Sequence, residues 1–213
     1  MKFASRQDAG RRLGEFLRQR GVAADLVLGL PRGGVVVAAE VARALAIPLD
    51  ILLVRKIGHP CHRELAVGAL AEPDVFILDE LTLAEAPVLR SELARVVQEE
   101  TARLREYRAR FRHSSPPSLM HKSVLLVDDG LATGATAEAA VLSAKRQLAR
   151  RIIIAVPVAS TSAFEKLQRA ADDVVALVVD PGFGAVGQYY DDFAQTTDEE
   201  VIALLSHPAP PPE

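Results

Sequence analysis

The sequence has little of several features that would place it in a special class of protein. It contains one cysteine (Cys61), no tryptophan and only 5% aromatic residues, and no apolar run approaches the roughly 18 residues of a membrane helix. A single cysteine excludes an intrachain disulfide and a tetrathiolate zinc site. The net charge is only -3, so no global basic field attracts nucleic acid. The N-terminus also lacks the apolar run of a signal peptide, and we therefore expect a cytoplasmic enzyme or binding protein.

What the 213 residues do have is the balance of a globular protein, with 49% hydrophobic and 25% charged residues. At about 150 residues per domain, this length predicts a single domain, which we place at residues 1–206, followed by a Pro-rich tail at 207–213. Within the domain we expect a core, a flap and hood, and one long helix. The expected bounds are about 1–58 and 119–180 for the core, 59–83 and 181–196 for the flap and hood, and 84–112 for the helix.

Short apolar runs alternate with helical stretches along most of the chain. The runs at 26–28, 49–54 and 124–127 read as strands, and Ser5 and Ser160 read as helix caps. This order predicts an α/β fold with an open, mostly parallel sheet flanked by helices. The pattern breaks between 55 and 83, where we expect a loop and then short strands near 65–70 and 75–78. Pro87 suits the first turn of the long helix that follows.

The most informative segment is VLLVDDGLATGAT, residues 124–136. Four apolar residues predict a buried strand, the adjacent carboxylates of Asp128 and Asp129 end it, and a loop of small residues then opens a helix. Ligands of open α/β sheets bind outside the carboxyl ends of the strands. The N–H groups of a helix start attract phosphate, whereas the acidic pair suits hydroxyl groups or Mg²⁺. A ligand with a phosphate and a vicinal diol, such as ribose 5-phosphate, satisfies both ends.

Other interpretations of this segment explain less. A plain turn at DDG and a plain helix cap at TGAT account for the residues one by one, but not for their combination within 13 residues. No lysine follows the glycines as in a Walker A loop, and the Gly-x-Gly-x-x-Gly pattern of dinucleotide folds is missing. A receiver domain needs roughly 100–120 residues, and only 90 run from Val124 to the end.

The same 13 residues resemble the signature of type I phosphoribosyltransferases, and the resemblance extends from about Leu26 to Phe193. It implies that the acidic pair binds the ribose hydroxyls of phosphoribosyl pyrophosphate (PRPP). It also implies that the 5-phosphate is bound by Gly130, Leu131, Ala132, Thr133, Gly134, Ala135 and Thr136. Many purine salvage members carry an acidic residue at the position of Ala132, so this chain does not resemble a hypoxanthine-type enzyme.

Two further segments resemble the pyrophosphate side of these enzymes. The GLPRGG segment at 29–34 is similar to a loop that often contains a non-proline cis peptide, which we expect here at Pro31–Arg32. Arg55 and Lys56 end the second predicted strand and precede a segment, 57–66, that resembles the mobile lid of the family. The resemblance implies pyrophosphate binding by Pro31, Arg32, Gly33, Arg55 and Lys56. A tight turn and a solvated strand end are the alternatives.

The segment after the last predicted strand resembles the base-binding hood of purine phosphoribosyltransferases. The resemblance implies base contacts from Phe183, Val186 and Tyr189. The aromatic residue that the family carries three positions before its glycine would fall on Gly184, with Phe183 one step earlier. An aromatic cluster covering an edge strand is the alternative.

For metals, the resemblance implies an Mg²⁺ cofactor bound by Asp128, Asp129 and Asp191. The nearby His59, Cys61 and His62 also have zinc-ligand chemistry. They offer at most three crowded ligands, with a proline between two of them, so we do not favour a zinc site.

Three functions follow as hypotheses. The first is a phosphoribosyltransferase that uses PRPP and Mg²⁺ to modify a nitrogenous base, with Asp128, Asp129 and Lys56 as catalytic residues. The second is a PRPP-sensing regulator of the same fold that binds nucleic acid without turnover, against which a pI of about 6.0 counts. The third is a catalytically silent domain of an oligomer. We expect the first, as a homodimer with neither membrane nor nucleic acid as a partner.

Overall fold

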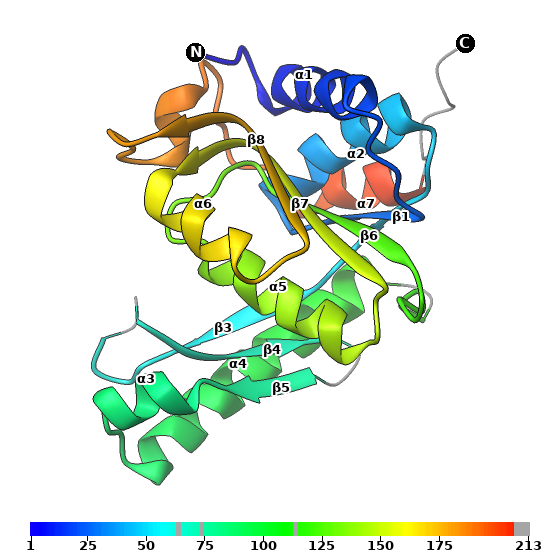
Figure 1. Ribbon diagram of the computed structural model, residues 1–213. Coiled ribbons are helices and arrows are strands. Elements are labelled where there is room, and N and C mark those ends of the chain that lie inside the picture. Colours follow the sequence, from blue (N-terminus) through cyan, green and yellow to red (C-terminus); the bar gives the residue numbers. More distant parts are fainter. Residues whose placement is uncertain (63–64, 73–74, 113–114, 207–213) are drawn as a thin grey trace.

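The computed structural model describes residues 1–62, 65–72, 75–112 and 115–206, so the Pro-rich tail predicted at 207–213 lies outside the described residues. Its core is a five-stranded parallel sheet in the order β2-β1-β6-β7-β8 (Figure 1). The strands are β1 (Leu26–Gly29), β2 (Leu49–Ile51), β6 (Ser123–Val127), β7 (Arg151–Ser160) and β8 (Asp173–Asp180). The middle strand, β6, is buried along its whole length, as its apolar run predicts. The predicted α/β fold class is confirmed.

Helices cover both faces of this sheet. The helices that do so are α1 (Arg6–Gln19), α2 (Gly33–Leu45), α5 (Ala135–Arg146) and α6 (Thr161–Gln168), while α7 (Asp198–Ser206) packs on α2. Side chains of α1 and α2 form one apolar layer with the sheet, and those of α5 and α6 form the other. The predicted caps of Ser5 and Ser160 are confirmed, because each hydroxyl accepts a backbone N–H of its helix. No helix within the described ranges is long and apolar enough to cross a membrane.

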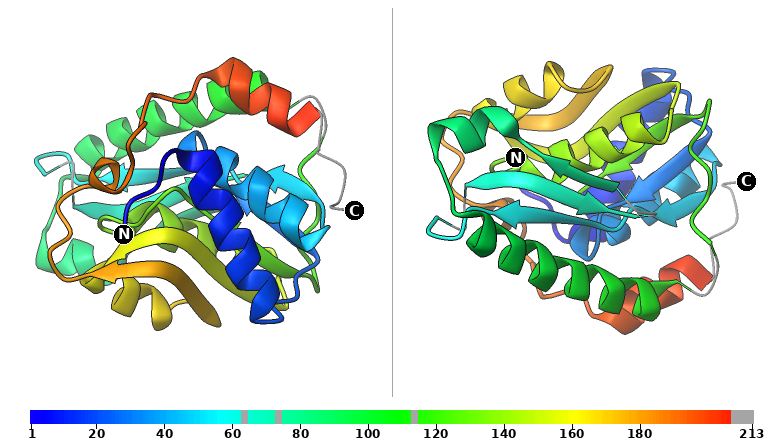
Figure 2. Two further views of the ribbon diagram at one scale, coloured as in Figure 1. Left: turned by 90° about the horizontal axis from the view of Figure 1, so that it is seen from above. Right: turned by 90° about the horizontal axis from the view of Figure 1, so that it is seen from below.

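A second, smaller sheet interrupts the parallel pattern. Its antiparallel strands are β3 (Val54–Gly58), β4 (Ala66–Ala71) and β5 (Val75–Leu78), and two helices follow, α3 (Glu80–Glu85) and α4 (Arg90–Phe111). The small sheet lies between α4 and α5 (Figures 1 and 2). Apolar side chains of β3 and β4 pack on α4 around Val96. Figure 2 also shows α7 beside the C-terminal end of α4.

Two boundaries predicted from the sequence are wrong. The strand expected at 49–54 is divided, because β2 ends at Ile51 and Val54 already belongs to β3 of the other sheet. Strand β3 thus occupies residues 54–58, where we expected the beginning of a loop and the end of the core segment 1–58. The helix expected at 84–112 is also divided, since Pro87 lies between α3 and α4 and cannot donate the N–H of a continuous helix.

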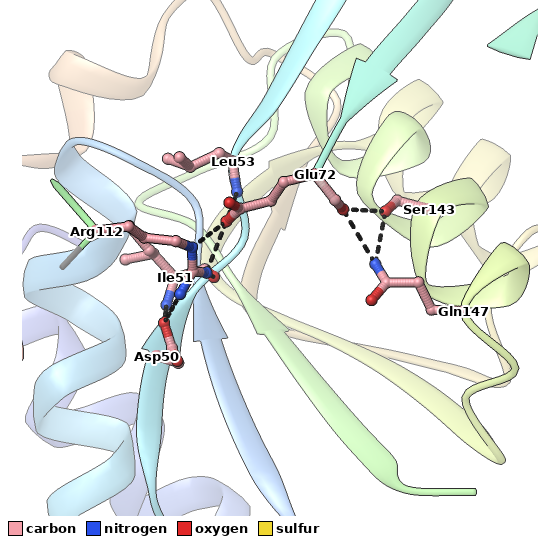
Figure 3. A network of polar contacts seen from close by, with 7 residues as sticks. All are labelled: Asp50, Ile51, Leu53, Glu72, Arg112, Ser143 and Gln147. Carbon is pink, nitrogen blue, oxygen red and sulfur yellow. Dashed lines mark hydrogen bonds and ion pairs between the residues drawn. The ribbon is translucent and has the colours of Figure 1, made fainter. Parts of the chain in front are cut away.

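A buried polar network joins the small sheet to the main one (Figure 3). Arg112 follows α4, and Nε of its guanidinium donates to Oε1 of Glu72, at the end of β4, at 2.6 Å. The same guanidinium reaches Asp50 Oδ1 at 3.0 Å and the carbonyl oxygen of Ile51 at 2.6 Å, both on β2. The Arg112 and Glu72 side chains are 5% and 1% exposed. The carbonyl oxygen of Glu72 also accepts Nε2 of Gln147, just after α5, at 3.2 Å, so four elements meet here.

Candidate active site

Two helices begin beside the acidic pair at the C-terminal end of β6. α2 follows β1, and a methyl group built on Gly33 or Gly34 at its start would lie 2.1 Å from Asp129 Oδ2 or 2.8 Å from Asp128 Oδ1. α5 follows the acidic pair itself, and its N-cap, Gly134, has a φ of 71°, which favours glycine. At neither start does the N-cap residue, Arg32 or Gly134, bond the helix through its side chain. At α5 the hydroxyl of Thr133 accepts the N–H of Ala135 at 3.4 Å. Uncapped helix starts bind anions, so the acidic pair stands between two candidate anion sites.

The predicted phosphate loop, 130–136, is held by the end of β7. The N–H of Leu131 donates to the carbonyl oxygen of Val158, and the N–H of Ser160 donates to that of Leu131, both at 2.9 Å. Oγ of Ser160 donates to the carbonyl oxygen of Ala132 at 2.7 Å. Within the loop, Thr133 is exposed and Thr136 is also exposed. The loop thus combines a fixed backbone with open hydroxyl groups, as phosphate binding requires.

The two carboxylates of the acidic pair differ in their surroundings. Oδ1 of Asp128 accepts the N–H of Asp129 at 2.9 Å. Burial, and then the charge of Asp129, raise the pKa of Asp128 well above its ordinary value. Burial also raises the pKa of Asp129, although a hydrogen bond from Arg6 opposes the change. A cation or hydroxyl donors at this pair would relieve the repulsion.

Arg6 is a site residue that the sequence analysis missed. It lies in the first turn of α1, and its Nε is 2.7 Å from Oδ2 of Asp129, 123 residues away along the chain. The sequence marked this region only as a helix start after Ser5. No local pattern signals a contact over such a separation, so only the packing of α1 against the sheet reveals it.

The loop before α2 has the predicted cis peptide at Pro31–Arg32. The side chain of Arg32, expected to bind pyrophosphate, forms an ion pair with Oδ1 of Asp198 on α7 at 3.5 Å. Arg110 of α4 pairs with the same carboxylate. The part of this loop that faces the acidic pair is therefore the backbone at Gly33 and Gly34.

Arg55 and Lys56 both lie within β3, so their side chains point to opposite faces of the small sheet. Arg55 faces α4, where its Nε and Nη2 are each 2.8 Å from Oε2 of Glu100. Lys56 faces the other side, toward α5. Arg55 and Lys56 were both expected to bind pyrophosphate, but the structure places their side chains on opposite faces of the small sheet. Of the two, Lys56 is on the face toward α5, the helix that begins beside the acidic pair. Part of the predicted lid, residues 63–64, lies outside the described residues.

The predicted hood residues, two aromatic rings and one valine, lie beside the loop 130–136 that follows the acidic pair. The Phe183 and Tyr189 rings stack with centroids 5.4 Å apart. The Tyr189 hydroxyl donates to Asp180 Oδ2 at 2.6 Å, and this hydrogen bond raises the pKa of Tyr189 to about 12. Val186 lies against Gly130, where an added Cβ would be 2.7 Å from Cγ1 of Val186. The structure therefore brings Phe183, Val186 and Tyr189 together beside the loop.

The three aspartates expected to bind Mg²⁺ do not form one cluster. Asp191 is 63% exposed and pairs with Nζ of Lys2 at 2.6 Å. Within the described residues, no group of three or more His, Cys, Asp or Glu side chains is arranged to hold a metal ion, which also applies to His59, Cys61 and His62. Asp128 and Asp129 alone still suit Mg²⁺, because this ion commonly uses one or two carboxylates together with substrate phosphates.

The parallel sheet carries the acidic pair and the loop 130–136 at its carboxyl edge, which is the arrangement expected from the resemblance to type I phosphoribosyltransferases. In agreement, the family model of the phosphoribosyl transferase domain matches residues 5–193. The chain belongs to this family.

Individual relatives agree with this assignment. A Mycobacterium tuberculosis protein, whose name calls it a phosphoribosyl transferase only provisionally, is 41% identical over 204 residues, or 95% of this chain and 46% of the relative. The chain thus spans about half the length of the curated relatives it matches. The crystal structure of TT1426 from Thermus thermophilus is 45% identical, with a TM-score of 0.88, and the match covers 98% of this chain and 100% of TT1426. The AQ2163 structure from Aquifex aeolicus shares the fold, with a TM-score of 0.52 at 12% identity over 86% of this chain and 84% of its own.

Proposed function

We propose that this chain is a phosphoribosyltransferase, which transfers the phosphoribosyl group of PRPP to a nitrogenous base and releases pyrophosphate. The observation that carries the proposal is the acidic pair flanked by two uncapped helix starts, one from α2 and one from α5. PRPP has the matching order of groups, with a phosphate at one end, a diol in the middle and pyrophosphate at the other end.

Each part of the site has a role in this reaction. The loop 130–136 binds the 5-phosphate, and Asp128 and Asp129 accept the ribose hydroxyls. Bond cleavage at the sugar leaves an oxocarbenium-like centre, and the same carboxylates stabilise its positive charge. The loop of Pro31, Arg32 and Gly33 binds the leaving pyrophosphate through backbone N–H groups, which Arg32 and the two glycines at 33 and 34 supply because proline has none. Lys56 adds its positive charge.

The remaining roles concern the metal ion, the base and the assembly of the protein. When bound, Mg²⁺ would supply positive charge to the pyrophosphate oxygens, and Asp128 and Asp129 are the residues that would hold it. Phe183, Val186 and Tyr189 are proposed to contact the base, because they lie beside the loop 130–136 that follows the acidic pair. We further propose a cytoplasmic homodimer that works without a nucleic-acid partner.

A panel of nucleobases, each incubated with PRPP and Mg²⁺, tests the proposal through the release of pyrophosphate. We expect pyrophosphate release with at least one base. With that same base, Asp128→Asn should release pyrophosphate about 10²–10³-fold more slowly. PRPP binding without release for any base, together with a salt-dependent affinity for nucleic acid, would instead support the regulator hypothesis. Failure to bind PRPP at all would contradict both.

A further inference from the structure

Arg6 contacts three groups around the acidic pair, each on a different side of its guanidinium. Nε donates to Oδ2 of Asp129 at 2.7 Å, and Nη1 donates to the carbonyl oxygen of Ala194 at 2.7 Å. The guanidinium carbon also lies 3.8 Å from the centroid of the Phe193 ring. The side chain is 11% exposed. These contacts hold the cation in one position, between the acidic pair and the segment 190–194.

The chain encloses the Arg6–Asp129 ion pair from two further directions. The hydroxyl of Tyr190 donates to the carbonyl oxygen of Asp129 at 2.6 Å, which ties the segment 190–194 to the acidic pair a second time. Gly33 closes another side, where an added Cβ would lie 2.1 Å from Oδ2 of Asp129 and 2.6 Å from Nε of Arg6. The pair is therefore unlike a solvated surface ion pair, whose contribution is usually small.

The charge of Arg6 matters because two adjacent carboxylates repel each other when both are ionised. Among the ion pairs of the described residues, the Arg6–Asp129 pair is the one that involves the acidic pair. Asp128 has no such partner there. Without Arg6, both carboxylate charges would have to be balanced by a ligand.

We infer that Arg6 is a positioning residue, which serves as the resident counter-charge of the acidic pair and couples it to the segment 190–194. The inference rests on the proposed function, since it takes the ribose hydroxyls as ligands of the pair. With Arg6 in place, one carboxylate charge is neutralised before a ligand arrives. In the ligand-free chain the pair then holds a divalent cation only weakly, so sugar hydroxyls and an Mg²⁺ that arrives with substrate phosphates can share it.

The test measures the binding of Mn²⁺ to the ligand-free chain of 213 residues by calorimetry, with Mn²⁺ as a probe of uncompensated carboxylate charge. Arg6→Gln removes the counter-charge, whereas Arg6→Lys keeps it. Arg12→Gln is the matched control, because Arg12 lies on the same helix and also has an ion pair, with Asp8 at 2.8 Å, and a ring contact, with Phe3. Arg6→Gln is expected to bind Mn²⁺ at least about tenfold more tightly than the unchanged chain, and the other two variants within about threefold of it.

An unchanged Mn²⁺ affinity in a folded Arg6→Gln variant would overturn the inference. If that variant does not fold, the double variant Arg6→Gln/Asp129→Asn decides, because it removes both charges. Recovery of a cooperative thermal transition supports the counter-charge role, and failure to recover assigns Arg6 to packing alone. A separate titration of the unchanged chain with ribose 5-phosphate tests the proposed function, so the two failures can be distinguished.

Discussion

The two sheets of this protein are held in place by different kinds of interaction. The parallel sheet lies between two continuous apolar layers, and its central strand β6 is wholly buried. The small antiparallel sheet has one apolar cluster against α4. Its connection to the rest of the chain includes the buried ion pair of Arg112 and Glu72, which the partly exposed carboxylate of Asp50 extends. The difference teaches that burial of apolar surface fixes the layer that carries the acidic pair, whereas ionic contacts between distant residues help to position the layer that carries Lys56.

The largest effect on stability is expected when the buried ion pair between Arg112 and Glu72 is broken. Arg112→Met leaves the carboxylate of Glu72 buried without its cation, which should lower the free energy of unfolding by about 3–5 kcal/mol. Urea denaturation measures the change. Arg150→Met is the matched control, because Arg150 is 65% exposed and lies 3.4 Å from Asp25, and it should lose less than about 1 kcal/mol. Equal losses in the two variants would contradict the role given to the buried network.

Asp128, one of the two carboxylates of the acidic pair, should respond in activity and not in stability. Asp128→Asn removes one of the two carboxylates that we propose to stabilise the oxocarbenium-like centre, so turnover should fall by about 10²–10³-fold. Because the charged form of Asp128 is disfavoured in the folded chain, this variant should be as stable as the unchanged chain, or more stable, at neutral pH. Asp129→Asn should instead lose stability, since it leaves Arg6 without its carboxylate.

The sign of the pH dependence follows from the raised pKa of Asp128. Folded chains bind this proton more tightly than unfolded ones, so the free energy of unfolding falls as pH rises from the ordinary value of 3.8 through the raised value. Thermal melts of Asp128→Asn and the unchanged chain across this range should diverge as pH rises. A difference between the two chains that does not change with pH would be evidence against the buried charge.

The phosphate loop should show a smaller effect, confined to binding. Thr136→Val removes one hydroxyl of the loop, and the affinity for PRPP should fall by about 1–3 kcal/mol, the range for a hydrogen bond to a charged group. Calorimetric titration measures it. Thr161→Val is the control, because Thr161 is also at the start of a helix, α6, but outside the loop. An unchanged affinity in Thr136→Val would remove this hydroxyl from the site.

The smallest effect is expected at the hood, where a single hydrogen bond changes. Asp180→Asn should move the pKa of Tyr189 from about 12 toward its ordinary value of 10, because the carboxylate acceptor is lost. The raised pKa means that this bond stabilises the fold below pH 10 and is lost as pH rises from 10 to about 12. Ultraviolet titration of the three tyrosines measures the shift, and Asp191→Asn should leave it unchanged.

Where the signal is local, the sequence predicted the structure well. The α/β class, the strand β6 and the caps of Ser5 and Ser160 are all present. The cis peptide at Pro31–Arg32 is present too, but it was expected from the family resemblance and not from a local pattern. Apolar runs and caps depend on residues within a few positions of one another, so their patterns can be read directly. The division of 49–54 between two sheets escaped this reading, because a continuous apolar run does not show where one strand ends and the next begins.

The sequence by itself thus determined the parallel sheet and the acidic pair with its loop. Both follow from short contiguous segments, because a short continuous apolar run favours a buried strand and the residues after it are then placed at the end of that strand. Only the tertiary structure decided that Arg6 joins Asp129, that Arg55 turns to Glu100 and that Arg32 meets Asp198. The physical reason is that a charged side chain pairs with whatever carboxylate the packing of the elements brings within reach, and that partner lies 45 residues away in the chain for Arg55 and 123 for Arg6.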